Sequence, residues 1–281
     1  MRMVVLSLVM ALCVAAQQVP VDPKVWSYAT GQTYLLMSYA AYCPEVNIRL
    51  WDCKWCQYNT TVQDFDVSDI FEEEGELVFM GVNPTYKEIV VSFRGSTDIT
   101  NWINNFQVFK VNYPFCDGCK VHKGFYDTWE SLRSQVLDGV SQLFSKYGYD
   151  IIVTGHSLGG AVASLASVEI KNTTGANVYL WNYGCPRVGN ENYANWLPSS
   201  ASGVSFIQRV VNNHDIVPQT PAEWQKYRHY PQEIWEQADP NNFIMCDPNN
   251  GEDPTCSDSV VGLSVDDHLT YFGLYEECEL T

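Results

Sequence analysis

Hydrophobic residues along the chain fall into short β-branched runs that alternate with longer amphipathic stretches. The short runs predict strands over 76–82, 88–93, 150–154, 177–183 and 206–211. The longer stretches have helical spacing and predict helices over 24–42, 124–147 and 159–171. Strands that alternate with helices indicate an α/β fold with a largely parallel sheet. Because no long linker or repeat interrupts this pattern, we expect one domain over residues 17–281.

The first residues form a separate segment. Arg2 gives a positive start, residues 4–14 are almost wholly apolar, and Val14-Ala15-Ala16 supplies small residues before a cleavage point. This pattern is typical of a secretory signal peptide, so we expect residues 1–16 to be removed and the protein to be secreted. The apolar run is too short to span a bilayer comfortably and no other run is long enough, so we expect no transmembrane segment.

Composition narrows the function classes. Hydrophobic residues make up 46% of the 281 residues and charged residues 17%, which supports a sizeable core and excludes disorder as the main state. Asp and Glu total 33 against 16 Lys and Arg, a net charge of −17. Nucleic acid and anionic headgroups repel so acidic a chain. We therefore exclude nucleic acid as a partner and expect any membrane contact to be hydrophobic.

Cysteine usage agrees with export. Nine of the ten cysteines follow Cys13, and an oxidising compartment favours disulfides, with at least one thiol free or paired between chains. The two CxxC pairs, Cys53/Cys56 and Cys116/Cys119, lie too far apart for a zinc finger. The acidic segment 247–258 lacks EF-hand spacing, so we expect no metal. Sequons at Asn59 and Asn172 are candidate glycosylation sites.

The segment Gly155-His156-Ser157-Leu158-Gly159 matches the G-x-S-x-G pattern of a nucleophile elbow. A predicted strand precedes it and a predicted helix follows it, as the motif requires. Glycines suit this position because the close neighbours of a sharply turned serine must lack side chains. The alternative is an ordinary strand-to-helix turn with a capping serine. We predict that Ser157 is a nucleophile and that the Leu158 N–H donates to an oxyanion.

A serine nucleophile needs a base, and after this elbow the expected order is Ser, then Asp or Glu, then His. The histidines that follow are His214, His229 and His268. Asp215 follows a predicted strand end, where catalytic groups gather in such sheets, and suits the orienting acid. His214 is its direct neighbour and cannot easily face it. His268 has the required order, whereas His229, in a Tyr- and Pro-rich loop, is the weaker alternative.

Six ordered motifs carry a family resemblance. They are Ser92-Phe93-Arg94-Gly95-Ser96, Asn101-Trp102, the elbow at 155–160, Tyr183-Gly184-Cys185-Pro186-Arg187-Val188-Gly189, Asp215-Ile216-Val217-Pro218 and Asp267-His268-Leu269 with Tyr271-Phe272. Together they resemble the fungal-type triacylglycerol lipases, the class 3 lipase family, over nearly the whole chain after the signal peptide. The resemblance implies an α/β-hydrolase fold, with a mostly parallel central sheet flanked by helices and a helical lid.

The resemblance also implies roles for individual residues. It implies a catalytic triad of Ser157, Asp215 and His268, and an oxyanion hole formed by Ser96 and Leu158. It implies no cofactor. The disulfides it implies are Cys43–Cys278, Cys53–Cys56, Cys116–Cys119 and Cys246–Cys256, which leaves Cys185 as a buried free thiol.

Residues 98–109 directly follow Ser96 and have the spacing of an amphipathic helix. Its apolar face consists of Ile99, Trp102, Ile103 and Phe106, and asparagines occupy the other face. The alternative is a surface helix packed on the core. The position beside Ser96 and the family resemblance favour a lid that exposes its apolar face at an oil–water interface.

We therefore predict a secreted, monomeric serine hydrolase that cleaves carboxylic esters of lipids, with triacylglycerol as the first substrate. A feruloyl-esterase-like hydrolase of soluble esters, a phospholipase A1 and a non-catalytic homologue are the alternatives. The apolar face of 98–109 counts against the soluble-ester hydrolase, and the intact triad counts against the non-catalytic homologue.

Overall fold

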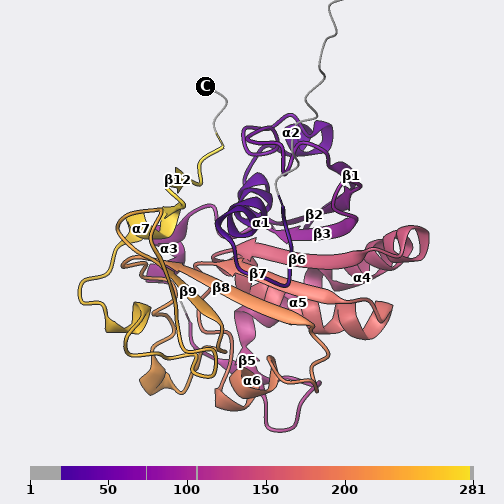
Figure 1. Ribbon diagram of the computed structural model, residues 1–281. Coiled ribbons are helices and arrows are strands. Elements are labelled where there is room, and N and C mark those ends of the chain that lie inside the picture. Colours follow the sequence, from indigo (N-terminus) through magenta and orange to yellow (C-terminus); the bar gives the residue numbers. More distant parts are fainter. Residues whose placement is uncertain (1–19, 74, 106, 279–281) are drawn as a thin grey trace, which may run out of the picture.

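The computed structural model describes residues 20–278 apart from 74 and 106, so the predicted signal peptide and Phe106 lie outside the described residues. An eight-stranded sheet forms the centre of the molecule (Figure 1). Its strands, in spatial order, are β1 (Asp66–Glu73), β2 (Glu76–Asn83), β3 (Glu88–Phe93), β6 (Asp150–His156), β7 (Val178–Tyr183), β8 (Phe206–Asn212), β9 (Glu233–Glu236) and β10 (Phe243–Met245).

The middle of this sheet is parallel and its edges are antiparallel. Strands β3, β6, β7, β8 and β9 run parallel, while β1, β2 and β10 pair antiparallel with their neighbours. The carboxyl ends of β3, β6, β7 and β8 therefore meet at one edge of the sheet, where loops carry catalytic groups in α/β folds. This arrangement confirms the predicted α/β class.

Helices cover both faces of the sheet. Helix α1 (Tyr28–Ala40) lies on one face, and α4 (Lys123–Tyr147) and α5 (Leu158–Thr174) lie on the other (Figure 1). Burial follows the alternation of the strands, since Val91 and Val153 pack in the α4–α5 core while Val90 and Ile152 pack in the α1 core. A β-strand buried on both faces reads as a continuous apolar run, which is why the middle strands were predictable.

The remaining elements are short and connect these layers. They are α2 (Glu45–Leu50), α3 (Ile99–Asn104), α6 (Glu191–Trp196), α7 (Val265–Leu269), the ladders β4 (Lys110–Asn112) with β5 (Lys120–His122) and β11 (Thr270–Tyr271) with β12 (Leu274–Tyr275), and the 3₁₀ turns η1 (Glu223–Gln225) and η2 (Ser257–Ser259). None of the helices that the structure describes could cross a bilayer.

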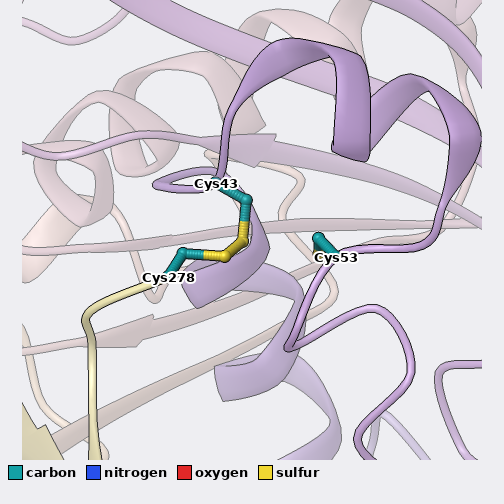
Figure 2. Close-up of side chains that lie close together, drawn as sticks. All are labelled: Cys43, Cys53 and Cys278. Carbon is teal, nitrogen blue, oxygen red and sulfur yellow. A yellow bond between two sulfur atoms is a disulfide. The ribbon is translucent and has the colours of Figure 1, made fainter. Parts of the chain in front are cut away.

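The four disulfides of the structure are those that the family resemblance implies, and Cys185 is a buried free thiol. The bond between Cys43 and Cys278 joins the turn after α1 to the C-terminal segment, with Cys53 close by (Figure 2). It thereby fixes the segment that follows α7 and β12 against the α1 face. Cys246 and Cys256 close the acidic loop after β10.

Candidate active site

Ser157 lies in a sharp turn between β6 and α5. Its backbone has φ 59° and ψ −130°, a conformation that L residues rarely adopt. The flanking glycines make the turn possible, because a Cβ on Gly159 would overlap the Phe93 carbonyl and a Cβ on Gly155 would overlap the backbone of Gly159. The turn places Ser157 at the N-terminus of α5, where the helix dipole favours developing negative charge.

Asp215 and His268 form a buried pair at the same edge of the sheet. His268 Nδ1 lies 2.9 Å from both carboxylate oxygens of Asp215, and the side chains are at most 1% exposed. The Val217 N–H donates to Asp215 Oδ1 at 2.8 Å, which holds the carboxylate in place. A carboxylate accepts only, so Nδ1 carries a proton and Nε2 of a neutral ring is the atom that can act as a base.

Ser157 and the Asp215–His268 pair meet at the turn after β7. The Ser157 N–H donates to the Tyr183 carbonyl at 2.9 Å, and a Cβ on Gly184 would lie 2.8 Å from Asp215 Oδ2 and 2.9 Å from His268 Nδ1. Ser157 Oγ and His268 Nε2 are buried and make no hydrogen bond to any described residue. Each is therefore free for the hydrogen bond that connects a serine nucleophile to its base.

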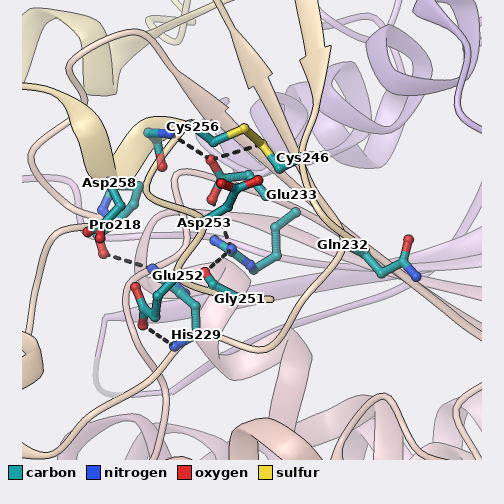
Figure 3. Close-up of polar contacts among 12 residues, drawn as sticks. Pro218, His229, Gln232, Glu233, Cys246, Gly251, Glu252, Asp253, Cys256 and Asp258 are labelled. Atoms are coloured by element: carbon teal, nitrogen blue, oxygen red, sulfur yellow. Dashed lines mark hydrogen bonds and ion pairs between the residues drawn. A yellow bond between two sulfur atoms is a disulfide. The ribbon is translucent and has the colours of Figure 1, made fainter. Parts of the chain in front are cut away.

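His229, the alternative base, lies in a different environment (Figure 3). Its Nε2 is 2.8 Å from the Pro218 carbonyl, and its backbone N–H donates to Glu252 at 2.7 Å. Burial, together with the nearby Arg209 and Arg187, lowers its pKa well below the usual range. The Nε2 of His229 thus faces a carbonyl, and Asp215 is paired with His268 instead of His229.

Helix α3 begins three residues after Ser96. Its polar residues face solvent, Ile99 is buried, and Trp102 and Ile103 are half-buried, with the Trp102 ring stacked on Phe125. Cavities of about 670 and 780 Å³ flank this helix, and the first is lined by Ser96, Trp102 and Phe109. Ser157 and His268 are buried and line neither cavity.

Comparison with known proteins decides the family. The family model described as Lipase (class 3) matches residues 90–224. A lipase from Rhizomucor miehei is 33% identical over 249 residues, which are 86% of this chain and 67% of that protein. A secreted mono- and diacylglycerol lipase from Fusarium solani is 34% identical over 208 residues, 71% of this chain and 61% of that protein. The chain belongs to the class 3 lipase family.

The fold of this class 3 lipase is that of the solved lipases. A triacylglycerol lipase whose catalytic centre is described as a serine protease triad superposes with a TM-score of 0.79 at 32% identity, over 87% of this chain and 93% of that one. The α/β-hydrolase fold is therefore confirmed. The chain spans about two thirds of the length of the curated relatives from Rhizomucor miehei and Fusarium solani.

The helix predicted as the lid of this class 3 lipase is shorter than expected. The helix expected over 98–109 ends at Asn104, and residues 107–109 are not helical. The Asn101 carbonyl accepts from both the backbone N–H and the side-chain amide of Asn105, at 3.1 and 2.9 Å. Beyond the helix, Tyr227 Oη donates to the Val108 carbonyl at 3.1 Å, a tertiary hydrogen bond in place of a helical one. Phe106, predicted on the apolar face, lies outside the described residues.

Two residues at the site of this class 3 lipase lie in the motifs of the family resemblance, but the sequence analysis assigned neither of them a role. Tyr271 donates to Asp215 Oδ2 at 2.6 Å, and Gly184, with φ 57°, leaves room for the Asp215–His268 pair. The signal that could have indicated Tyr271 is its place in the family motif, three residues after His268. The candidate glycosylation sites differ in exposure, since Asn172 is exposed at the end of α5 and Asn59 is half-buried.

Proposed function

We propose that this chain is a secreted, monomeric hydrolase of acylglycerol esters that acts at a lipid–water interface. The observation that carries the proposal is the buried Asp215–His268 pair beside a strained serine whose Oγ has no hydrogen-bond partner. The relatives named lipase and secreted mono- and diacylglycerol lipase support the substrate class and the export.

The chemistry follows from the three side chains. His268 Nε2 takes the proton of Ser157 Oγ as the oxygen attacks the ester carbonyl, and Asp215 stabilises the imidazolium that forms. The backbone N–H groups of Ser96 and Leu158 hold the oxyanion. His268 then protonates the leaving alcohol, and water hydrolyses the acyl-enzyme by the same steps in reverse.

The cover supports a lipid rather than a soluble substrate. Ile99, Trp102 and Ile103 present one apolar face toward the protein, and each large apolar side chain favours burial by about 1.5–3 kcal/mol. In water this face stays against the site. At an oil surface it gains lipid contact, so the open state is favoured by its greater affinity for the interface.

Covalent labelling tests the nucleophile. A fluorophosphonate ester should modify Ser157, and Ser157→Ala should abolish the modification. His268→Ala should lower kcat by a factor of about 10³ or more with folding retained, because the base is lost. His229→Ala should lower stability and leave kcat within a few-fold. Labelling of another serine, or a loss of activity confined to His229→Ala, would overturn these assignments.

A rate profile tests the substrate class. Triglycerides, diglycerides, phospholipids, short p-nitrophenyl esters and feruloyl esters should be compared at equal ester concentration. We expect emulsified acylglycerols to be cleaved fastest, with a rate increase above the solubility limit. A profile led by phospholipids would make the protein a phospholipase A1, and one led by feruloyl esters would make it a soluble-ester hydrolase.

A further inference from the structure

A buried polar chain lies directly behind the candidate active site, centred on His156. The imidazole of His156 is fully buried and stacks on the His268 ring, with centroids 4.5 Å apart and an interplanar angle of 28°. Its Nε2 lies 2.8 Å from the backbone oxygen of His268, and its Nδ1 lies 2.8 Å from Tyr42 Oη. None of the proposed catalytic steps uses these side chains.

Hydrogen-bond chemistry fixes the direction of the first contact. A backbone carbonyl accepts only, so His156 Nε2 donates to His268 whether the His156 ring is neutral or protonated. Tyr42 Oη is the hydrogen-bond partner of Nδ1. Glu276 Oε2, which makes no hydrogen bond to any described residue, also lies 3.1 Å from Nδ1 and forms an ion pair with it when the His156 ring is protonated. The Tyr42 hydroxyl keeps its proton, since burial and the Glu276 charge raise the pKa of Tyr42 well above its ordinary value. A donor is thus always present at this junction.

Tyr42 also contacts the turn that carries Ser96. The backbone of Gly95 makes a hydrogen bond with Tyr42 that offsets part of the rise in its pKa. A Cβ on Gly95 would overlap Tyr42 Oη and would lie 3.0 Å from Ser157 Cβ, so these groups are in close contact. The Tyr42 hydroxyl therefore lies between the proposed oxyanion turn and the histidine that holds the His268 backbone.

The Cys43–Cys278 disulfide crosslinks the two segments that carry Tyr42 and Glu276, whose oxygens lie near His156 Nδ1. Tyr42 immediately precedes Cys43, and Glu276 comes two residues before Cys278. Trp55 Nε1 adds a hydrogen bond of 3.1 Å to the Glu276 carbonyl. The crosslink thus connects the end of α1 with the C-terminal segment at the point where their side chains meet His156.

We propose that Tyr42, His156 and Glu276 form a positioning network, clamped by the Cys43–Cys278 disulfide, that aligns the His268 backbone with the oxyanion turn at Gly95–Ser96. The inference rests on the proposed serine-hydrolase function. No member of the network acts on the ester itself, so each works through Ser157, His268 or the oxyanion donors. Misalignment of these groups raises the barrier to reaction more than it weakens substrate binding, so losses should appear in kcat.

The test compares Tyr42→Phe, Glu276→Ala and His156→Gln with wild type in the full chain. The substrate is a short p-nitrophenyl ester below its solubility limit, where adsorption to a lipid surface does not contribute to the rate. Each variant should lower kcat about tenfold with KM within about twofold, and the rate of fluorophosphonate labelling at Ser157 should fall in parallel. Glu276→Gln, which keeps an acceptor oxygen, should recover most of the kcat that Glu276→Ala loses.

Tyr34→Phe is the matched control for Tyr42→Phe. Tyr34 lies on α1, which ends two residues before Tyr42, and its hydroxyl donates to the buried Glu88 at 2.7 Å, at the opposite end of β3 from Ser157. It should lose stability without losing kcat. For the clamp, Cys43→Ala/Cys278→Ala should reproduce the kcat loss of Glu276→Ala, whereas Cys116→Ala/Cys119→Ala, which removes a bond in the β4–β5 connection, should not.

The outcomes separate the network from the proposed function. If Tyr42→Phe and Glu276→Ala keep kcat within twofold of wild type, or if Tyr34→Phe loses as much kcat as Tyr42→Phe, the network is overturned while the serine hydrolase stands. If His156→Gln fails to fold, the Tyr42 and Glu276 variants decide. A wild-type protein that is neither active nor labelled at Ser157 overturns the proposed function and this inference with it.

Discussion

The Tyr271 hydroxyl donates a hydrogen bond of 2.6 Å to Asp215 Oδ2, the carboxylate that also binds His268 Nδ1. Asp215 is therefore held from β11 as well as from its own loop, where the Val217 N–H donates to Oδ1. Because α7 and β11 are consecutive, the segment that supplies His268 also supplies the group that orients its partner.

Loss of the Tyr271 hydroxyl should weaken the Asp215–His268 pair but leave the pair in place. A hydrogen bond to a charged group contributes about 1.5–3 kcal/mol, so Tyr271→Phe should lower kcat about tenfold and the free energy of unfolding by about 1.5 kcal/mol. Steady-state kinetics on a soluble ester and denaturant unfolding measure the two effects. Tyr275→Phe, an exposed tyrosine on β12, is the control. An unchanged kcat for Tyr271→Phe would show that Asp215 needs no second support.

Gly184→Ala should distinguish the effect of backbone strain on stability from the effect of displacing the Asp215–His268 pair on activity. Its Cβ would lie within 2.9 Å of Asp215 Oδ2 and His268 Cε1, so we expect kcat to fall by a factor of about 10² as the pair is displaced. Gly148→Ala is a matched control, because Gly148 has a φ of 63° and no atom within 4 Å of the added Cβ. Both should lose about 1–2 kcal/mol of stability from the left-handed backbone, and only Gly184→Ala should lose activity.

Trp102→Ser tests the lid. The indole stacks on Phe125 and is the largest apolar group on the described face of α3. Because an indole suits an apolar–polar boundary, its loss should lower activity on emulsified long-chain triglyceride far more than on a soluble short ester. The ratio of the two activities is the measurement, with Asn101→Ala on the exposed face as control. An equal loss on both substrates would contradict a lid that opens at lipid.

Glu236 should make stability depend on pH. It is 1% exposed, and burial raises its pKa to about 8, although hydrogen bonds from the Phe272 and Gly273 backbone oppose the shift. The folded state therefore holds a proton that the unfolded chain releases near pH 4.5, so this group costs stability as pH rises from about 4.5 to 8. Each pKa unit corresponds to about 1.4 kcal/mol.

Glu236→Gln should remove this dependence. Its Tm should equal that of wild type near pH 4 and exceed it increasingly up to pH 8, since the amide can still accept from the Phe272 N–H, which Glu236 Oε1 accepts at 2.7 Å. Thermal unfolding across this pH range is the measurement. A constant difference in Tm at every pH would show that Glu236 does not titrate in the window.

The middle of the fold could be predicted from the sequence because its strands are apolar on both faces. Strands β2, β3, β6, β7 and β8 and helices α4 and α5 lie within a few residues of their predicted bounds. Helix α1 is shorter than expected because Ser27 caps it, accepting from the Thr30 N–H at 3.0 Å. Strand β1 carries Asp66, Asp69 and Glu72 and was not predicted, since an edge strand need not be apolar.

In the candidate site, too, the sequence indicates residues that lie in local motifs but not the roles that depend on tertiary contacts. Ser157, Asp215 and His268 could be proposed as a triad because the elbow has a local motif and the other two follow a fixed chain order. Three other features depend on tertiary contacts, namely the hydroxyl of Tyr271, the missing side chain of Gly184 and the phenol of Tyr42. Their roles arise only where β3, β7 and the C-terminal segment come together. No periodicity along the chain encodes such contacts.

The Cys43–Cys278 bond closes a covalent ring, since its cysteines are 235 residues apart and enclose the sheet, the candidate triad and the cover. A protease that cuts one exposed loop, such as the one around Val261, which is 90% exposed, would open this ring without releasing either piece. Nicked protein should then migrate as a single chain until it is reduced, and the two fragments could stay docked. We propose that this protein is exported, and an extracellular medium can be rich in proteases. There, a first cut need not abolish its activity.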